Sequence, residues 1–120
     1  MKMKSEREYL WTSVVLDIEN KIITQEYKTG ENIPSLNELT KIYSIGKATA
    51  QKVLDDLSDR GIIVKAVGRG SYVKKDTLVR KKLVAKQKRQ FLYHVEGIKQ
   101  ISKTLGMTKT EVLEFIEKNL

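Results

Sequence analysis

Residues 61–73 read GIIVKAVGRGSYV, and their pattern differs from that of the sequence on both sides. Two runs rich in β-branched residues, IIVKAV and SYV, enclose the short loop GRG. Gly68 and Gly70 in this loop permit the positive φ angles that a tight hairpin connection requires. The segment therefore predicts a short β-hairpin with Arg69 at its tip.

Three helices are expected before this hairpin. Apolar residues recur at helical spacing over Tyr9–Glu26 and again over Lys47–Arg60. Between these segments, Ser35 and Glu38 form the pattern of a capping box, which predicts a short helix that ends before Gly46. The order of helix, short helix, helix and hairpin is that of a winged helix-turn-helix, a mainly α fold with a small β-hairpin.

The last part of the chain predicts a tail of two helices. Asp76 is placed to cap a long helix, and Thr108 with Glu111 repeats the capping-box pattern before a final helix. Two helices this apolar cannot bury their stripes on each other alone, so a second copy of the chain is the expected cover. We therefore divide the chain into a winged-helix domain, 1–75, and a dimerisation tail, 76–120. The residues assigned to the dimer interface are Val84, Phe91, Val95, Ile98, Leu105 and Ile116.

Positive charge is concentrated in one part of the sequence. The chain holds 23 Lys and Arg against 15 Asp and Glu, a formal net charge of +8. Residues 61–90 alone carry ten of these cations and a single acid, Asp76. A local field of this kind attracts a polyanion, nucleic acid before any other. The alternative interpretation, a solvated lysine-rich helix face, stays open on charge alone.

Composition argues against several classes of protein. The 120 residues include no cysteine, which excludes disulfides and fits the cytoplasm as the expected location. His94 is the only histidine, so zinc binding and Ser-His or Cys-His catalysis are disfavoured, and we expect no enzyme activity, metal or cofactor. The N-terminus lacks the apolar stretch of a signal peptide, and no apolar run approaches the ~20 residues of a membrane span. No membrane association is expected.

Several short motifs occur in register over about residues 9–74. They are GENIPS at 30–35, GKAT at 46–49, GII at 61–63 and GRGSYV at 68–73. Together they resemble the GntR family of bacterial regulators. The resemblance implies a DNA-binding, repressor-type module, with the third helix in the major groove and the hairpin wing at the minor groove. The short tail resembles that of the YtrA-type branch, whose two-helix tail dimerises.

The DNA contacts that this resemblance implies fall on the start of the second helix, the start of the third helix and the wing. They are Ser35, Asn37, Lys47, Ala48, Thr49, Gln51, Lys52, Gly68, Arg69 and Gly70. The family usually has Arg where Asn37 and Gln51 stand, and Ser-Arg where Gly46 and Lys47 stand. Lysine lacks the bidentate fork that reads guanine, so the family's operator preference does not carry over. Gln51 offers the donor and acceptor that adenine requires, which favours an A·T-richer site.

Two functions from different classes follow from these features. The leading one is a homodimeric transcriptional regulator, a repressor, that binds double-stranded DNA at a pseudo-palindromic operator. The alternative is a winged-helix module that binds an acidic protein partner, which the missing arginines at Asn37 and Gln51 keep open. The sequence identifies no small-molecule effector. Trp11 is predicted to pack in the core or at the dimer contact rather than to stack on a nucleotide.

Overall fold

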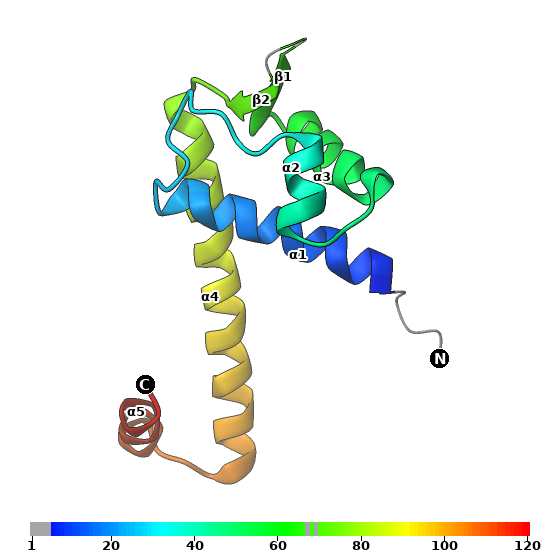
Figure 1. Cartoon of the computed structure of the whole chain (residues 1–120). Coiled ribbons are helices and arrows are strands. Elements are labelled where there is room, and N and C mark those ends of the chain that lie inside the picture. The colour runs from blue at the N-terminus through cyan, green and yellow to red at the C-terminus, as the bar shows by residue number, and fades with distance from the viewer. Residues whose placement is uncertain (1–5, 67, 69) are drawn as a thin grey trace. The chain divides into compact units, whose positions relative to one another are not determined.

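The computed structural model describes residues 6–66, 68 and 70–120, and among these residues it shows five helices and one β-hairpin (Figure 1). The elements are α1 (Glu6–Ile23), α2 (Leu36–Ile42), α3 (Lys47–Asp59), β1 (Ile63–Ala66), β2 (Gly70–Val73), α4 (Thr77–Leu105) and α5 (Lys109–Lys118). This order confirms the mainly helical fold and the sequence of elements expected of a winged helix-turn-helix.

Contacts divide the chain into two compact units, Met1–Val84 and Ala85–Leu120. We call them the winged-helix unit and the tail unit. The first turns of α4 belong to the winged-helix unit, because the side chains of Val79 and Leu83 are buried in its core. The sequence pattern groups these two residues with the tail instead. The functional division after residue 75 stays a prediction.

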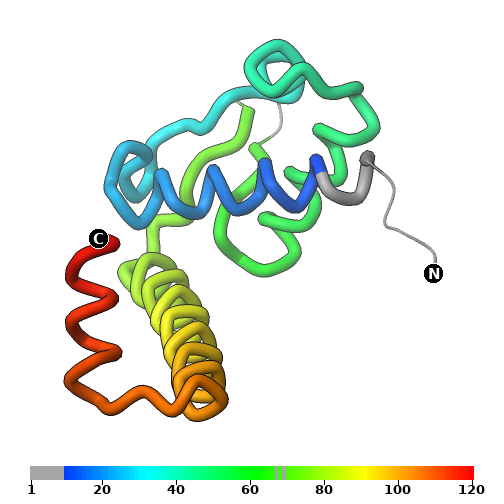
Figure 2. The backbone as a smooth tube through the Cα atoms, turned by 90° about the horizontal axis from the view of Figure 1, so that it is seen from below, coloured from blue at the N-terminus to red at the C-terminus, as the bar shows by residue number. Residues whose placement is uncertain are grey.

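The core of the winged-helix unit is a single apolar cluster to which its helices and hairpin all contribute. One side of α3 is buried in it, through Ala50, Val53, Leu54 and Leu57. Helix α1 crosses beside α2 and α3, and it contributes Ile18, which is fully buried (Figures 1 and 2). Trp11 packs against this core in a half-buried position, so its predicted packing role is confirmed.

Helix α1 ends earlier than we predict from the sequence. The expected end is Glu26, whereas the last helical residue is Ile23. The chain leaves the helix because Gln25 adopts a left-handed conformation, with φ of 64°. Tyr27 then turns back, its N–H donating to the Lys21 carbonyl oxygen at 3.0 Å, and its side chain packs against the core.

The capping box predicted for α2 is confirmed. The Glu38 N–H donates to Ser35 Oγ at 3.2 Å, and the Ser35 N–H donates to the Glu38 carboxylate at 3.0 Å. The hydrogen bond from the Ser35 N–H lowers the pKa of Glu38, because it stabilises the ionised carboxylate. At the other end of α2, the Tyr43 hydroxyl donates to Asp17 of α1 at 2.5 Å, which ties the short helix to α1.

The wing is an antiparallel pair in which Val64 of β1 lies opposite Tyr72 of β2. The segment before α2 extends this pairing through a bridge between Asn32 and Tyr72, so the wing is anchored to the loop that leads into α2. Gly68 and Gly70 have φ of 73° and 70°, which confirms the loop conformation predicted from the sequence. Arg69 lies outside the described residues.

The tail unit contains the later turns of α4 and the whole of α5. The predicted cap at the start of α4, which lies in the winged-helix unit, is confirmed by the Leu78 N–H, which donates to Asp76 Oδ1 at 2.9 Å. The second capping box is also confirmed: the Glu111 N–H donates to Thr108 Oγ1 at 3.2 Å, and the reciprocal bond measures 3.0 Å. Figure 2 shows α5 turning back beside the last turns of α4.

Candidate nucleic-acid interface

Helix α3 has two faces of opposite character. Its apolar residues are buried in the core, whereas Lys47, Ala48, Gln51 and Lys52 are exposed, and Thr49 is half-buried. Residues three or four positions apart lie on the same side of a helix. The structure therefore brings the residues predicted on α3 together on one solvent-facing surface, which is where a DNA-reading helix must present its side chains.

The other predicted contacts lie at the start of α2 and in the wing loop. Asn37 is exposed on the first turn of α2, while Ser35 is half-buried and engaged in the capping box. Gly68 and Gly70 are exposed on either side of Arg69, which is not described. These positions belong to the same compact unit as α3.

Lys52 is exposed, but its ammonium group is engaged in a contact with another helix. Its Nζ atom lies 4.5 Å from the centroid of the Trp11 ring, a cation–π contact between α3 and α1. The two side chains line a surface hollow of about 350 Å³. Because this contact holds the Lys52 ammonium over α1, Lys52 fits a phosphate contact at the edge of the interface better than a base contact at its centre.

Asp55 is a residue that sequence reasoning missed. Its carboxylate oxygen Oδ1 accepts a hydrogen bond from Gln51 Nε2 at 2.9 Å and a second from Lys65 Nζ of β1. The hydrogen bonds from Lys65 and then from Gln51 lower the pKa of Asp55. The spacing of Gln51 and Asp55, one helical turn, indicates the first contact, but no local pattern indicates the second, which crosses to the wing.

Arg60 fixes the C-terminal end of α3 in place. Its guanidinium contacts the Glu19 carboxylate of α1 at 2.9 Å and that of Asp56 at 2.7 Å, and the Glu19 side chain is 1% exposed. Partial burial acts to lower the pKa of Arg60, but the hydrogen bonds that Arg60 donates to Asp56 and Glu19 outweigh it and the pKa is raised. The contact with Glu19 ties the end of α3 to α1.

The residues assigned to the dimer interface are largely uncovered in the single chain. Phe91 is 73% exposed and Leu105 67%, Val95 and Ile98 are exposed to a lesser degree, and Val84 and Ile116 are half-buried. The exposed ones present apolar surface to solvent. Their contact with a second copy stays a prediction.

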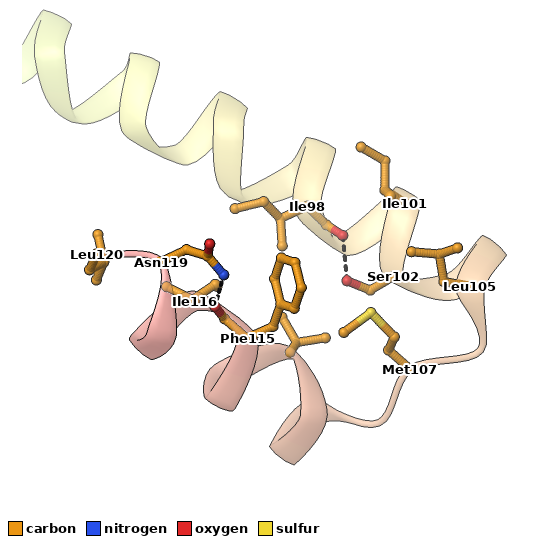
Figure 3. A pocket seen from close by; sticks show the side chains of 10 residues that line it. Ile98, Ile101, Ser102, Leu105, Met107, Phe115, Ile116, Asn119 and Leu120 are labelled. Carbon is orange, nitrogen blue, oxygen red and sulfur yellow. Dashed lines mark hydrogen bonds between the residues drawn. The ribbon is translucent and has the colours of Figure 1, made fainter.

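A hollow of about 310 Å³ lies between the last turns of α4 and α5. Phe115 of α5 points toward Ile98 of α4 across it (Figure 3). Its polar groups are engaged locally, since the Ser102 hydroxyl donates to the Ile98 carbonyl oxygen and the Asn119 amide donates to that of Phe115, each at 2.7 Å. All the other side chains that line the hollow are apolar.

Two further properties of the described chain bear on function. Across residues 6–66, 68 and 70–120, no group of three or more His, Asp or Glu side chains is arranged to hold a metal ion. Within the same residues, none of the helices combines the length and apolar character that crossing a membrane would need.

The fold, with one face of α3 buried and the other exposed, is that of a winged helix-turn-helix protein. Residues 10–73, more than half of the chain, match the family model described as bacterial regulatory proteins, gntR family. The chain belongs to this family, which confirms the resemblance seen in the sequence. Membership of the YtrA-type branch stays a prediction.

Individual relatives agree with this assignment. The HTH-type transcriptional regulator TreR of Bacillus subtilis is 32% identical over 105 residues, which cover 86% of this chain and 40% of TreR. The chain thus spans less than half the length of this curated relative, which is a transcriptional regulator and not an enzyme.

Solved structures show the same fold. A GntR family transcriptional regulator from Listeria monocytogenes superposes with a TM-score of 0.75 at 23% identity, covering 90% of this chain and 92% of that one. The AraR DNA-binding domain in complex with operator ORR3 gives 0.53 at 22% identity, covering 61% and 84%.

Proposed function

We propose that the protein is a homodimeric DNA-binding transcriptional regulator that acts as a repressor at a pseudo-palindromic operator. The observation that carries the proposal is the exposed face of α3, with Lys47, Ala48 and Gln51 held on a helix whose other side is buried. The chain belongs to a family of bacterial regulatory proteins, and a relative of the same fold was solved with its operator. Repression is the role that the family resemblance implies.

In the proposed complex, α3 enters the major groove and the wing reaches the minor groove. Lys47 and Gln51 contact base edges, and Asn37 and Lys52 contact the backbone on either side, because phosphate contacts position a protein and base contacts specify its site. Arg69 at the wing tip enters the minor groove, where a narrow groove concentrates negative potential. Lys74 and Lys75, exposed after β2, add phosphate contacts beside the wing.

The tail supplies the second copy that a two-fold operator requires. The exposed side chains of Phe91, Val95 and Leu105 are apolar, and contiguous apolar surface of this kind marks an association site. A symmetric dimer through this surface presents two copies of α3. If both dock in successive major grooves on one side of the DNA, the half-sites lie about one helical turn, ~34–36 Å, apart.

DNA binding is tested by fluorescence anisotropy with the DNA upstream of the protein's own gene, in competition with random duplex. Tight binding that random duplex displaces poorly is the expected result. If about six phosphates are neutralised per dimer, affinity falls on the order of a thousandfold between 50 and 200 mM salt. A flat salt response, or no preference over random duplex, contradicts the proposal and favours an acidic protein partner instead.

A further inference from the structure

Asp55 joins the reading helix to the wing. It follows Gln51 by one turn on α3, and its carboxylate accepts the Gln51 amide N–H at 2.9 Å. The same oxygen pairs with Lys65, which lies on β1 of the wing. A Gln–Asp pair on its own is a common feature of helix surfaces. The lysine from a different element distinguishes this one, because it fixes the carboxylate from outside the helix.

The contact determines what Gln51 has left to offer. A glutamine amide carries two N–H groups and one carbonyl oxygen. With one N–H bound to Asp55, the amide cannot rotate freely, and its carbonyl oxygen and second N–H remain available. Adenine presents a donor and an acceptor side by side in the major groove, which matches that remaining pair. A side chain already held in place loses less conformational freedom when it binds.

Building on the proposed function, we propose that Asp55 is a specificity-determining positioning residue. Its carboxylate orients the Gln51 amide for one base pair of each half-site, and Lys65 holds the carboxylate and offsets its charge beside the phosphates. Asp55 itself touches no base. Its negative charge opposes binding to any DNA, so the protein gives up affinity for random sequence and gains discrimination.

Four single variants of the full chain separate this role from a simple charge effect. Gln51→Ala removes the reading group, Asp55→Ala removes its support, and Lys65→Met removes the group that holds Asp55. Asp59→Ala is the matched control, because it deletes the same charge from the last turn of the same helix. Asp56 cannot serve as the control, since it pairs with Arg60.

The measurement is anisotropy on three kinds of duplex: an operator selected from a random library by the wild type, its single-base-pair variants, and random duplex. Gln51→Ala is expected to lose preference at one position of each half-site. In Asp55→Ala, the preference at that same position is expected to fall about fivefold, which lies within the discrimination that a bidentate base contact provides. This variant also binds random duplex more tightly, while Lys65→Met loses the same preference and binds random duplex more weakly. Asp59→Ala keeps the wild-type preference everywhere.

Each contrary result has a distinct meaning. Wild-type preference in Asp55→Ala, at the position that Gln51→Ala changes, overturns the positioning role and leaves the regulator proposal intact. The positioning role is also overturned if Asp59→Ala changes that position as much, or if Gln51→Ala changes no position. A wild type that selects no sequence overturns the proposed function, and the role of Asp55 with it. Asp55→Leu, which keeps the branched side-chain shape but offers no acceptor to Gln51, repeats the test if Asp55→Ala melts at a lower temperature than the wild type.

Discussion

The winged-helix unit and the tail unit differ in how far they bury their apolar residues. Every buried apolar side chain of the described chain lies in the winged-helix unit, from Val14 to Leu83. The tail unit, described over its whole length, has none, and it exposes Phe91, Leu105 and Phe115 to solvent. A unit that closes its own core can fold alone, whereas one that leaves its apolar surface uncovered depends on a partner. The first presents a folded surface, and we propose that the second joins two copies.

The largest effect is expected from a charge placed in the exposed apolar surface of the tail unit. Ile98→Glu places a charge in the proposed dimer contact, where an unpaired buried charge costs several kcal/mol. Sedimentation should then show monomers at concentrations where the wild type is dimeric, with operator affinity lost and the helix content of the winged-helix unit retained. Lys99→Glu, which puts the same charge on the neighbouring exposed residue, should stay dimeric. A dimeric Ile98→Glu would refute the tail assignment.

The stability of the winged-helix unit should not depend on dimerisation. Leu57 of α3 is fully buried, so Leu57→Ala is expected to lower the free energy of unfolding of this unit by about 2–5 kcal/mol. Leu78→Ala, at a residue 51% exposed, should change it by less than about 0.5 kcal/mol. Urea denaturation at two protein concentrations checks both. A loss for Leu57→Ala that depends on concentration would show that this unit does not fold alone.

Breaking the ion pair between Arg60 and Glu19 should have an effect on stability between those of the core and capping substitutions. Arg60→Ala leaves the buried Glu19 carboxylate without its guanidinium. Because Arg60 is itself more than a third exposed, solvent screening reduces the cost to about 2 kcal/mol. Arg89→Ala, at an exposed arginine of the tail unit, should leave the unfolding of the winged-helix unit unchanged. Equal thermal shifts in the two variants would exclude a specific role for the pair.

The smallest effects on stability are expected at the two capping boxes, of which each unit has one. Hydrogen bonds from Ser35 and Thr108 lower the pKa values of Glu38 and Glu111. Their stabilisation is therefore present above the unfolded-state pKa, about 4.3, and is lost as pH falls through the lower folded-state pKa.

Ser35→Ala should cost the winged-helix unit about 1 kcal/mol, and Glu38→Gln should flatten its stability between about pH 5 and pH 3. Glu111→Gln should leave the acid unfolding of this unit unchanged and affect only the tail, as circular dichroism melts across this range would show. Loss of acid sensitivity of the winged-helix unit in Glu111→Gln instead would contradict the separation of the two units.

Local signals made most of the fold predictable. The capping boxes at Ser35 and Thr108 and the positive-φ glycines at 68 and 70 could all be predicted, because each depends on residues within four positions of one another. The end of α1 could not, since no glycine or proline follows Ile23 before Gly30, and it is Gln25 that turns out of the helix.

The site was predictable only in outline. The exposed face of α3 follows from helical spacing, so Lys47 and Gln51 could be named. The contacts that hold this face could not, because Lys52 meets Trp11 and Asp55 meets Lys65 only once separate elements pack together. Sequence patterns indicate which residues share a face, and tertiary packing decides which of them are already engaged.

Selection of binding sites from a random duplex library, using the full chain at low salt, tests the central claim that a dimer reads DNA through α3. A dimer that presents two copies of α3 should enrich an inverted repeat whose half-sites are centred about one helical turn apart. Ile98→Glu should enrich single half-sites or nothing. If the wild type enriches no sequence, or a single unrepeated site that Ile98→Glu enriches equally well, then the protein is not a dimeric regulator that reads DNA through α3.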